Sequence, residues 1–289
     1  MKLILAQPAV PRFQWELEVL LTNIAQFGEH EVTLLFSKHD DTIPEFLKKK
    51  YGCRVFVYED KRVYHNYIPA IRPYLLYVHL LTHPEYEQGQ YLYIDSDIIF
   101  REMPDFTTFD LDPTKVYGAD CDGYIGLDYI LSCEKGFEIA SRMAQICGIT
   151  LDQMRDVPGI GAQIILNNPT ADFWLKAYRN SNAIHRYFQG VPSNIQKWTA
   201  EMWGQLWAWV EAGIVPVHST ELDFSRPTDL IEVWDKFKIM HNAGVTVNDP
   251  ELFYKGQYTD RSPLDENLDW VTDKKVSKKY TEAIRKVIE

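Results

Sequence analysis

The chain has 289 residues, 46% of them hydrophobic and 25% charged, which is ordinary globular composition with enough length to bury a full core. Its formal net charge of −11 argues against a surface that binds nucleic acid indiscriminately. No run of about 18 apolar residues occurs, and the apolar start before Gln7 is too short for a secretory signal. The four cysteines form no C-x-x-C pair, which fits free thiols in a reducing compartment. We therefore expect a cytoplasmic protein.

Strand and helix patterns alternate along the first hundred residues. Apolar segments typical of strands occur at 3–10, 31–37, 53–60 and 91–100. Segments with helical spacing lie between them, at 11–28, 40–52 and 68–84. This order predicts a parallel sheet with helices on both faces, in which ligands bind beyond the carboxyl ends of the strands.

After residue 100 the pattern becomes mixed. Further strands are expected at 116–120 and 162–168, and strand or loop segments at 214–218 and 237–244. Helices are expected at 172–180 and 199–213. The chain contains no Ser/Gly-rich linker, internal repeat or low-complexity segment, so we expect one α/β domain over 1–289 with a mixed central sheet.

The fourth strand segment, YLYIDSDIIF, carries two carboxylates, Asp95 and Asp97. In a regular strand these side chains would point to the same face and repel each other unless a cation or a proton lies between them. Oxygen ligands suit Mg²⁺ or Mn²⁺, which keep open positions for phosphate oxygens. The alternative is a carboxylate pair at a strand end that faces solvent or caps a loop.

The place of this triplet, after three strand–helix units, resembles the D-x-D motif of GT-A glycosyltransferases. The resemblance implies the nucleotide-diphospho-sugar transferase fold. It also implies that Asp95 and Asp97 hold Mn²⁺ or Mg²⁺ on the diphosphate of a UDP-sugar, with Ser96 beside the donor. Such an ion would offset the charge that builds on the leaving diphosphate.

The segment IMHNAGV (239–245) resembles the H-x-x-G pattern of family 8 members of this fold. The resemblance implies that His241 is a third metal ligand, with Asn242 and Gly244 close to the phosphates. Family 8 usually continues with Lys-Pro-Trp, which is absent here, and Lys255 is the expected replacement cation. A structural histidine and a solvated surface lysine are the alternatives.

The resemblance implies four further site residues. Arg72, in the helix before the triplet, would contact the donor, or would instead pair with a local carboxylate. Gln7, at the end of the first strand, would read a base edge. Gln163, in a glycine-containing strand, would touch the sugar or the acceptor, unless it only follows a tight turn. Glu201 would act as the base or orient the acceptor, unless it is a helix-surface residue beside the N-cap Thr199.

Four tryptophans precede or occupy the helix expected at 199–213, and they do not all share one helical face. We expect some of them in the core and others in a platform for a sugar or a base. They are Trp198, Trp203, Trp207 and Trp209.

Within the single domain the resemblance implies a nucleotide-sugar-binding half at 1–120 and an acceptor-binding half at 121–250. Residues 251–289 would form a C-terminal extension. Its last part, 274–289, carries six basic and two acidic residues with apolar residues along one face, which predicts an amphipathic helix. We expect this helix to dock on the domain, with attraction to a membrane surface or nucleic acid as the alternative.

The expected activity is metal-dependent transfer of a hexose or N-acetylhexosamine from a UDP-sugar to an acceptor hydroxyl. Retention of configuration is favoured because His241 resembles family 8. The acceptor could be a glycan, a protein or a modified DNA base such as a hydroxymethylated pyrimidine. Two other classes stay open: a HAD-like phosphatase, which also has D-x-D at a strand end, and a non-catalytic nucleotide-sugar or glycan-binding protein.

Overall fold

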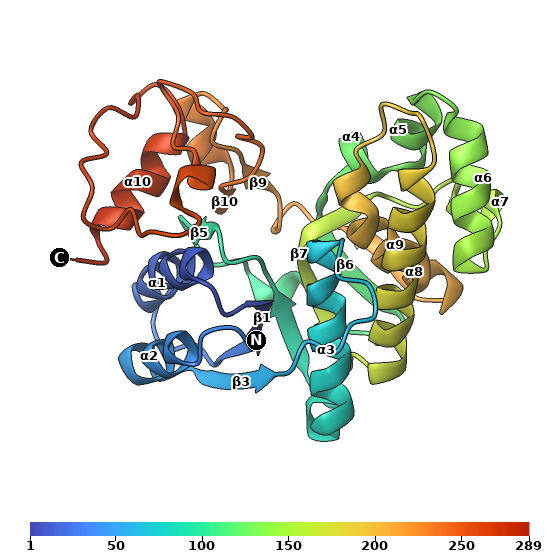
Figure 1. Cartoon of the computed structure of the whole chain (residues 1–289), viewed down its shortest axis with the longest axis horizontal. Helices are drawn as coiled ribbons and strands as arrows, with labels where there is room; N and C mark the ends of the chain where they lie inside the picture. The colour runs from blue at the N-terminus through green and yellow to red at the C-terminus, as the bar shows by residue number, and fades with distance from the viewer. Residues whose placement is uncertain (289) are drawn as a thin grey trace. The chain divides into compact units, whose positions relative to one another are not determined.

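The computed structural model describes residues 1–288 as a mixed α/β fold with a seven-stranded central sheet and a smaller three-stranded sheet (Figure 1). The chain divides into two compact units. The first comprises Met1–Val57, Ile94–Thr107 and Glu221–Glu289, and the second comprises Tyr58–Tyr93 and Thr108–Thr220. The predicted fold class, α/β with a mixed central sheet, is confirmed. The division into a donor half and an acceptor half stays a prediction.

The first unit contains the helices and strands from both ends of the sequence. They are β1 (Lys2–Pro8), α1 (Pro11–Ala25), β2 (Val32–Ser37), α2 (Thr42–Tyr51), β3 (Arg54–Tyr58), β5 (Ile98–Phe100), β9 (Phe224–Ser225), β10 (Ile239–His241) and α10 (Ser277–Arg285). Strands β1 and β2 pair in parallel, as the strand–helix–strand pattern predicts. Strand β10 pairs antiparallel with β5 and parallel with β9. Proline at the start of α1 and Gly52 at positive φ after α2 are ordinary helix boundaries.

The C-terminal helix belongs to the core of the first unit. Trp15 of α1 is 1% exposed, packs against Phe253, and donates its indole N–H to the carbonyl of Tyr258 at 2.9 Å. Tyr280 and Ile284 of α10 join the same buried cluster. The predicted docking of this helix is therefore confirmed for the described residues, which leave out Glu289.

The second unit contains most of the helices. Its elements are α3 (Ile71–Thr82), β4 (Gln90–Tyr93), β6 (Lys115–Asp120), α4 (Asp122–Ile125), α5 (Leu127–Ser132), α6 (Gly136–Cys147), α7 (Leu151–Met154), β7 (Ile160–Asn167), α8 (Ala171–Gln189), α9 (Ala200–Glu211) and β8 (Val215–His218). Strand β7 pairs antiparallel with β4 and β6, while β6 pairs in parallel with β8. Helix α8 packs against both α3 and α9, and Trp174 of α8 and Trp203 and Trp207 of α9 are fully buried there.

Three of the four tryptophans at 198–209 lie in the core of the second unit. Trp203 and Trp207 are fully buried and Trp209 is 2% exposed. The Trp203 indole N–H donates to the carbonyl of Ile125 at 2.8 Å, so its polar atom is satisfied. Trp198 is 57% exposed, so the expected split of this group between core and surface is confirmed.

The single strand expected at 91–100 is wrong. The structure has two strands there, β4 and β5, joined by a turn that contains Asp95 and Asp97. The apolar residues on both sides of Asp-Ser-Asp suggest one strand, but neighbouring carboxylates are not readily accommodated in a buried ladder. The chain therefore leaves one sheet after Tyr93 and enters the other at Ile98.

All four cysteines are buried free thiols, as predicted. Burial raises the pKa of Cys53 to about 11 and that of Cys147 to about 12, so both are un-ionised at neutral pH. Among the described residues, no helix combines the length and apolar character that crossing a bilayer requires.

A buried histidine of α3 makes the stability of the second unit depend on pH. His79 is fully buried and its Nδ1 lies 2.7 Å from the hydroxyl of Tyr58. Burial, with a smaller effect of His83, lowers the pKa of His79 to about 4 from 6.5. As the pH falls below 6.5 the unfolded chain takes up the proton first, so the free energy of unfolding falls until the pH reaches about 4.

Between pH 7 and pH 5 the free energy of unfolding should fall in both proteins. We expect this fall to be on the order of 1 kcal/mol smaller in His79→Gln than in the wild type. Urea unfolding at a series of pH values measures this difference. The exposed His39→Gln is the matched control and should follow the wild type. Equal pH dependence in His79→Gln and the wild type would show that this imidazole is not what titrates.

Candidate metal centre

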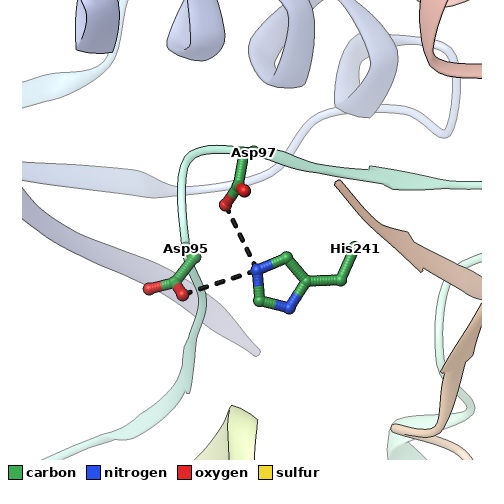
Figure 2. Close-up of side chains that lie close together, drawn as sticks. All are labelled: Asp95, Asp97 and His241. Carbon is green, nitrogen blue, oxygen red and sulfur yellow. Dashed lines mark ion pairs between the residues drawn. The ribbon is translucent and has the colours of Figure 1, made fainter. Parts of the chain in front are cut away.

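The three predicted metal ligands, Asp95, Asp97 and His241, come together in the first unit (Figure 2). The Nε2 atom of His241 lies 3.2 Å from Oδ1 of Asp97 and 3.6 Å from Oδ2 of Asp95. One ligand atom from each residue lies within 4.8 Å of the other two. Two carboxylates and one imidazole around a common point suit a divalent cation such as Mn²⁺ or Mg²⁺.

The pairing of β5 with β10 sets this geometry. His241, the last residue of β10, is opposite Ile98, the residue that follows Asp97. The backbone N–H of Asn242 donates to the carbonyl of Asp97 at 2.8 Å, which extends the pairing into the turn. Residues 144 positions apart in sequence (97 to 241) are therefore held together by backbone hydrogen bonds as well as side chains.

A fourth predicted residue, Lys255, is at the same place. Its ammonium forms an ion pair with Oδ2 of Asp97, while His241 lies on Oδ1. Burial would raise the pKa of Asp97, but Lys255 and then His241 outweigh it and hold that pKa well below its usual range. Asp97 is therefore ionised, which is the state a metal ligand requires.

A buried carboxylate on α1, which the sequence analysis did not select, supports the turn. Glu16 is fully buried and accepts hydrogen bonds from the Ser96 hydroxyl at 2.5 Å and from Arg12 Nε at 2.8 Å. Burial raises the pKa of Glu16 above its ordinary value, and the Arg12 guanidinium opposes this shift. The signal that could have identified Glu16 is its place between the apolar residues Trp15 and Leu17 of a buried helix.

The C-terminal helix adds a buried hydroxyl near this network. Tyr280 is fully buried, and burial together with the charges of Glu16 and Asp97 raises its pKa well above the ordinary value. The neighbouring Asn242 side chain opposes that shift. Tyr280 lies on the apolar face that the amphipathic pattern predicts for this helix, and the pattern gives no sign that its hydroxyl lies near the buried charges.

Three further residues predicted to contact the nucleotide-sugar donor, Gln7, Asn242 and Gly244, also belong to the first unit. Gln7 is 3% exposed and its Nε2 donates to the carbonyl of Leu35 at 3.3 Å. Gly244 has a φ of 93°, a left-handed conformation that favours glycine. Asn242 is 3% exposed, directly after the histidine.

Two predicted residues meet in the second unit. Arg72 of α3 donates from Nη2 to Oε2 of Glu201 of α9 at 2.7 Å, and Glu201 is 2% exposed. The structure thus shows Arg72 paired with a carboxylate, which was the alternative to contact with the donor. That carboxylate belongs to Glu201, which is itself a predicted site residue. The Glu201 backbone N–H donates to the Tyr67 hydroxyl at 2.7 Å, and that hydroxyl donates to the Trp198 carbonyl at 2.5 Å. Glu201 is therefore fixed in the core rather than on the helix surface.

Gln163 lies inside β7, fully buried. The preceding Ala162 has a φ of 57°, and the pairing of β6 with β7 shifts register beside it. Such a β-bulge re-aims the side chains around it. The tight turn expected before Gln163 is therefore a β-bulge within strand β7.

A seven-stranded mixed sheet with an Asp-x-Asp turn and a histidine beside it defines the GT-A type of nucleotide-sugar transferase fold. Solved glycosyltransferases share this architecture. The structure of the bifunctional glycosyltransferase WbbM matches with a TM-score of 0.56 and 9% identity, over 99% of this chain and 49% of that one. The galactosyltransferase LgtC, solved with donor and acceptor sugar analogues, matches with a TM-score of 0.52 and 13% identity, over 98% and 95%.

A third match is the glycosyltransferase GlyE of Streptococcus pneumoniae TIGR4, with a TM-score of 0.50 and 10% identity, over 99% of this chain and 60% of that one. The chain thus spans about half of WbbM and less than two thirds of GlyE. No protein-family model and no curated protein sequence matches it. The chain therefore has the GT-A glycosyltransferase fold, shared with proteins of very different sequence.

Proposed function

We propose that this protein is a metal-dependent glycosyltransferase that moves a hexose or N-acetylhexosamine from a UDP-sugar to an acceptor hydroxyl. The observation that carries the proposal is the convergence of Asp95, Asp97 and His241 in a fold shared with LgtC and WbbM. These three residues would hold Mn²⁺ or Mg²⁺. The ion would neutralise charge on the diphosphate as it leaves the sugar.

The residues around the triad support a diphosphate as the ligand. Lys255 has its ammonium on Asp97, where it balances a carboxylate until an anion and a metal enter. Its flexible side chain would then turn from Asp97 to the phosphate oxygens. The backbone at Gly244, at positive φ, permits a close approach by phosphate, and Gln7 would contact the base.

The second unit supplies the groups proposed to act on the sugar and the acceptor. Glu201 has one carboxylate oxygen on Arg72, which suits a residue that orients an acceptor hydroxyl and stabilises an oxocarbenium-like state. Gln163 would contact the sugar from the bulged strand. We propose retention of configuration, which the resemblance of His241 to family 8 favours. We also propose that the protein is cytoplasmic, because its cysteines are free thiols.

The exposed tryptophan of the second unit is a proposed acceptor contact. Trp198 is 57% exposed and stacks on Tyr124, with ring centroids 6.3 Å apart and planes at 23°. A stacked pair of aromatic rings offers a flat surface to the apolar face of a sugar ring or to a base. Such a surface is compatible with each proposed acceptor, which is a glycan, a protein or a modified DNA base.

Calorimetry with a panel of nucleotide sugars tests the donor part of the proposal. We expect one UDP-sugar to bind in the presence of MnCl₂ and not in the presence of EDTA. Labelled sugar from that donor should then appear in one lysate fraction, glycan, protein or DNA. Metal-dependent binding without transfer or hydrolysis would favour a non-catalytic binding protein. Binding of equal strength with EDTA would contradict the metal centre.

A further inference from the structure

Glu16 of α1 is a fully buried carboxylate that faces the proposed metal centre rather than solvent. Its Oε2 accepts the hydroxyl hydrogen of Ser96 at 2.5 Å, and its Oε1 accepts from Arg12 Nε at 2.8 Å. A buried carboxylate is costly unless each oxygen is hydrogen-bonded. The two donors here satisfy one oxygen each, so the group is fixed in a single orientation.

Ser96 stands between the two carboxylate ligands of the turn. Its side chain is buried, and the Ser96–Glu16 hydrogen bond joins the turn to α1 across 80 positions of sequence. The turn is otherwise fixed on its other side by the hydrogen bond from Asn242 N–H to the Asp97 carbonyl. Residues 95–97 are therefore held from two directions, which limits how far Asp95 and Asp97 can move apart.

Charge balance alone does not explain this arrangement. The Arg12 side chain is 30% exposed and can be solvated without a buried partner, whereas Glu16 has no exposed surface. Glu18, two residues on in the same helix, shows the purely structural alternative. It is 5% exposed and pairs with Lys50 of α2 at 2.7 Å, away from the turn.

We propose that Glu16 is a positioning residue of the metal centre, which acts through the Ser96 hydroxyl to hold Asp95 and Asp97 at the spacing that a divalent cation requires. The inference rests on the proposed metal site. Arg12 in turn orients Glu16, so that α1 supplies two residues to support ligands that belong to another part of the sequence. Neither residue touches the ion.

Binding of Mn²⁺ alone, measured by electron paramagnetic resonance at a temperature well below the melting transition, tests the proposal. Glu16→Gln has one acceptor oxygen in place of two, and Ser96→Ala removes the hydroxyl with little change in volume. We expect each variant to bind Mn²⁺ about tenfold more weakly than the wild type. The double variant should be no weaker than either single one, since both break the same contact.

Glu18→Gln is the matched control, because it removes a buried carboxylate from the same helix without touching the turn. It should lower the melting temperature as Glu16→Gln does and leave Mn²⁺ affinity unchanged. Wild-type affinity in folded Ser96→Ala and Glu16→Gln would overturn the proposal and leave Glu16 a structural residue. Absence of Mn²⁺ binding by the wild type would instead refute the metal centre itself.

Discussion

Asp97→Asn is expected to reduce sugar transfer at least about a thousandfold while the protein stays folded. Both carboxylate oxygens of Asp97 are engaged, since His241 lies on one oxygen and Lys255 on the other. The amide keeps the shape of the side chain but has no charge. Its NH₂ group replaces one of the two acceptor oxygens and can only donate hydrogen bonds. Such a group binds a hard divalent cation poorly and can place an N–H against Lys255 or His241.

A graded series locates the effect at the metal. Asp95→Asn should reduce sugar transfer less than Asp97→Asn does. Asp95 lies 3.6 Å from His241, which is the longer of the two carboxylate–imidazole contacts. Raising the Mn²⁺ concentration should restore part of the activity in Asp95→Asn. The exposed Asp235→Asn, in the same unit, is the control and should transfer at the wild-type rate. Transfer by Asp97→Asn at the wild-type rate would exclude this turn as the catalytic metal site.

Arg72→Met is expected to destabilise the protein by about 3 kcal/mol and to abolish most transfer. The substitution leaves the Glu201 carboxylate, 2% exposed, without the guanidinium that lies 2.7 Å from it. The large cost comes from removing one partner of a buried ion pair rather than from the net strength of the pair. Replacement of both partners by apolar residues removes that cost.

The double variant Arg72→Met/Glu201→Met therefore separates structure from function. We expect it to recover most of the lost stability in urea unfolding and none of the lost transfer. The exposed Arg179→Met of α8 should behave as the wild type in both measurements. If the double variant recovers activity together with stability, the pair is only a structural element of the second unit.

Local sequence patterns predicted most of the secondary structure, and they failed where chemistry and periodicity disagree. The apolar strand β1 and the helix α1 follow from burial and spacing alone. The pattern predicts that the Asp-Ser-Asp triplet lies inside a strand, because four strand-forming residues precede it and three follow it. No local signal shows that the residues after it pair with β10 rather than continue β4, because that pairing joins distant segments.

The candidate site was predictable only in part, for a similar reason. Asp95, Asp97 and His241 were selected because their pattern resembles a known family, whereas Glu16 in a helix is read as a surface residue by default. The pairing of Arg72 with Glu201 spans 129 positions, and either residue alone has an ordinary explanation. Whether a charged residue is buried can be predicted only when its partner in the fold is known.

The order in which the chain is synthesised has a consequence for the first unit. Trp15 hydrogen-bonds to the carbonyl of Tyr258, 243 positions later, and Tyr280 completes the same core. At about 5–20 residues per second, the ribosome needs at least about ten seconds to join these segments. Until then Trp15 of α1 lacks the C-terminal residues that cover it, while all of Tyr58–Tyr93 and Thr108–Thr220 emerges. The three candidate metal ligands are likewise complete only when His241 has been synthesised, after the whole second unit.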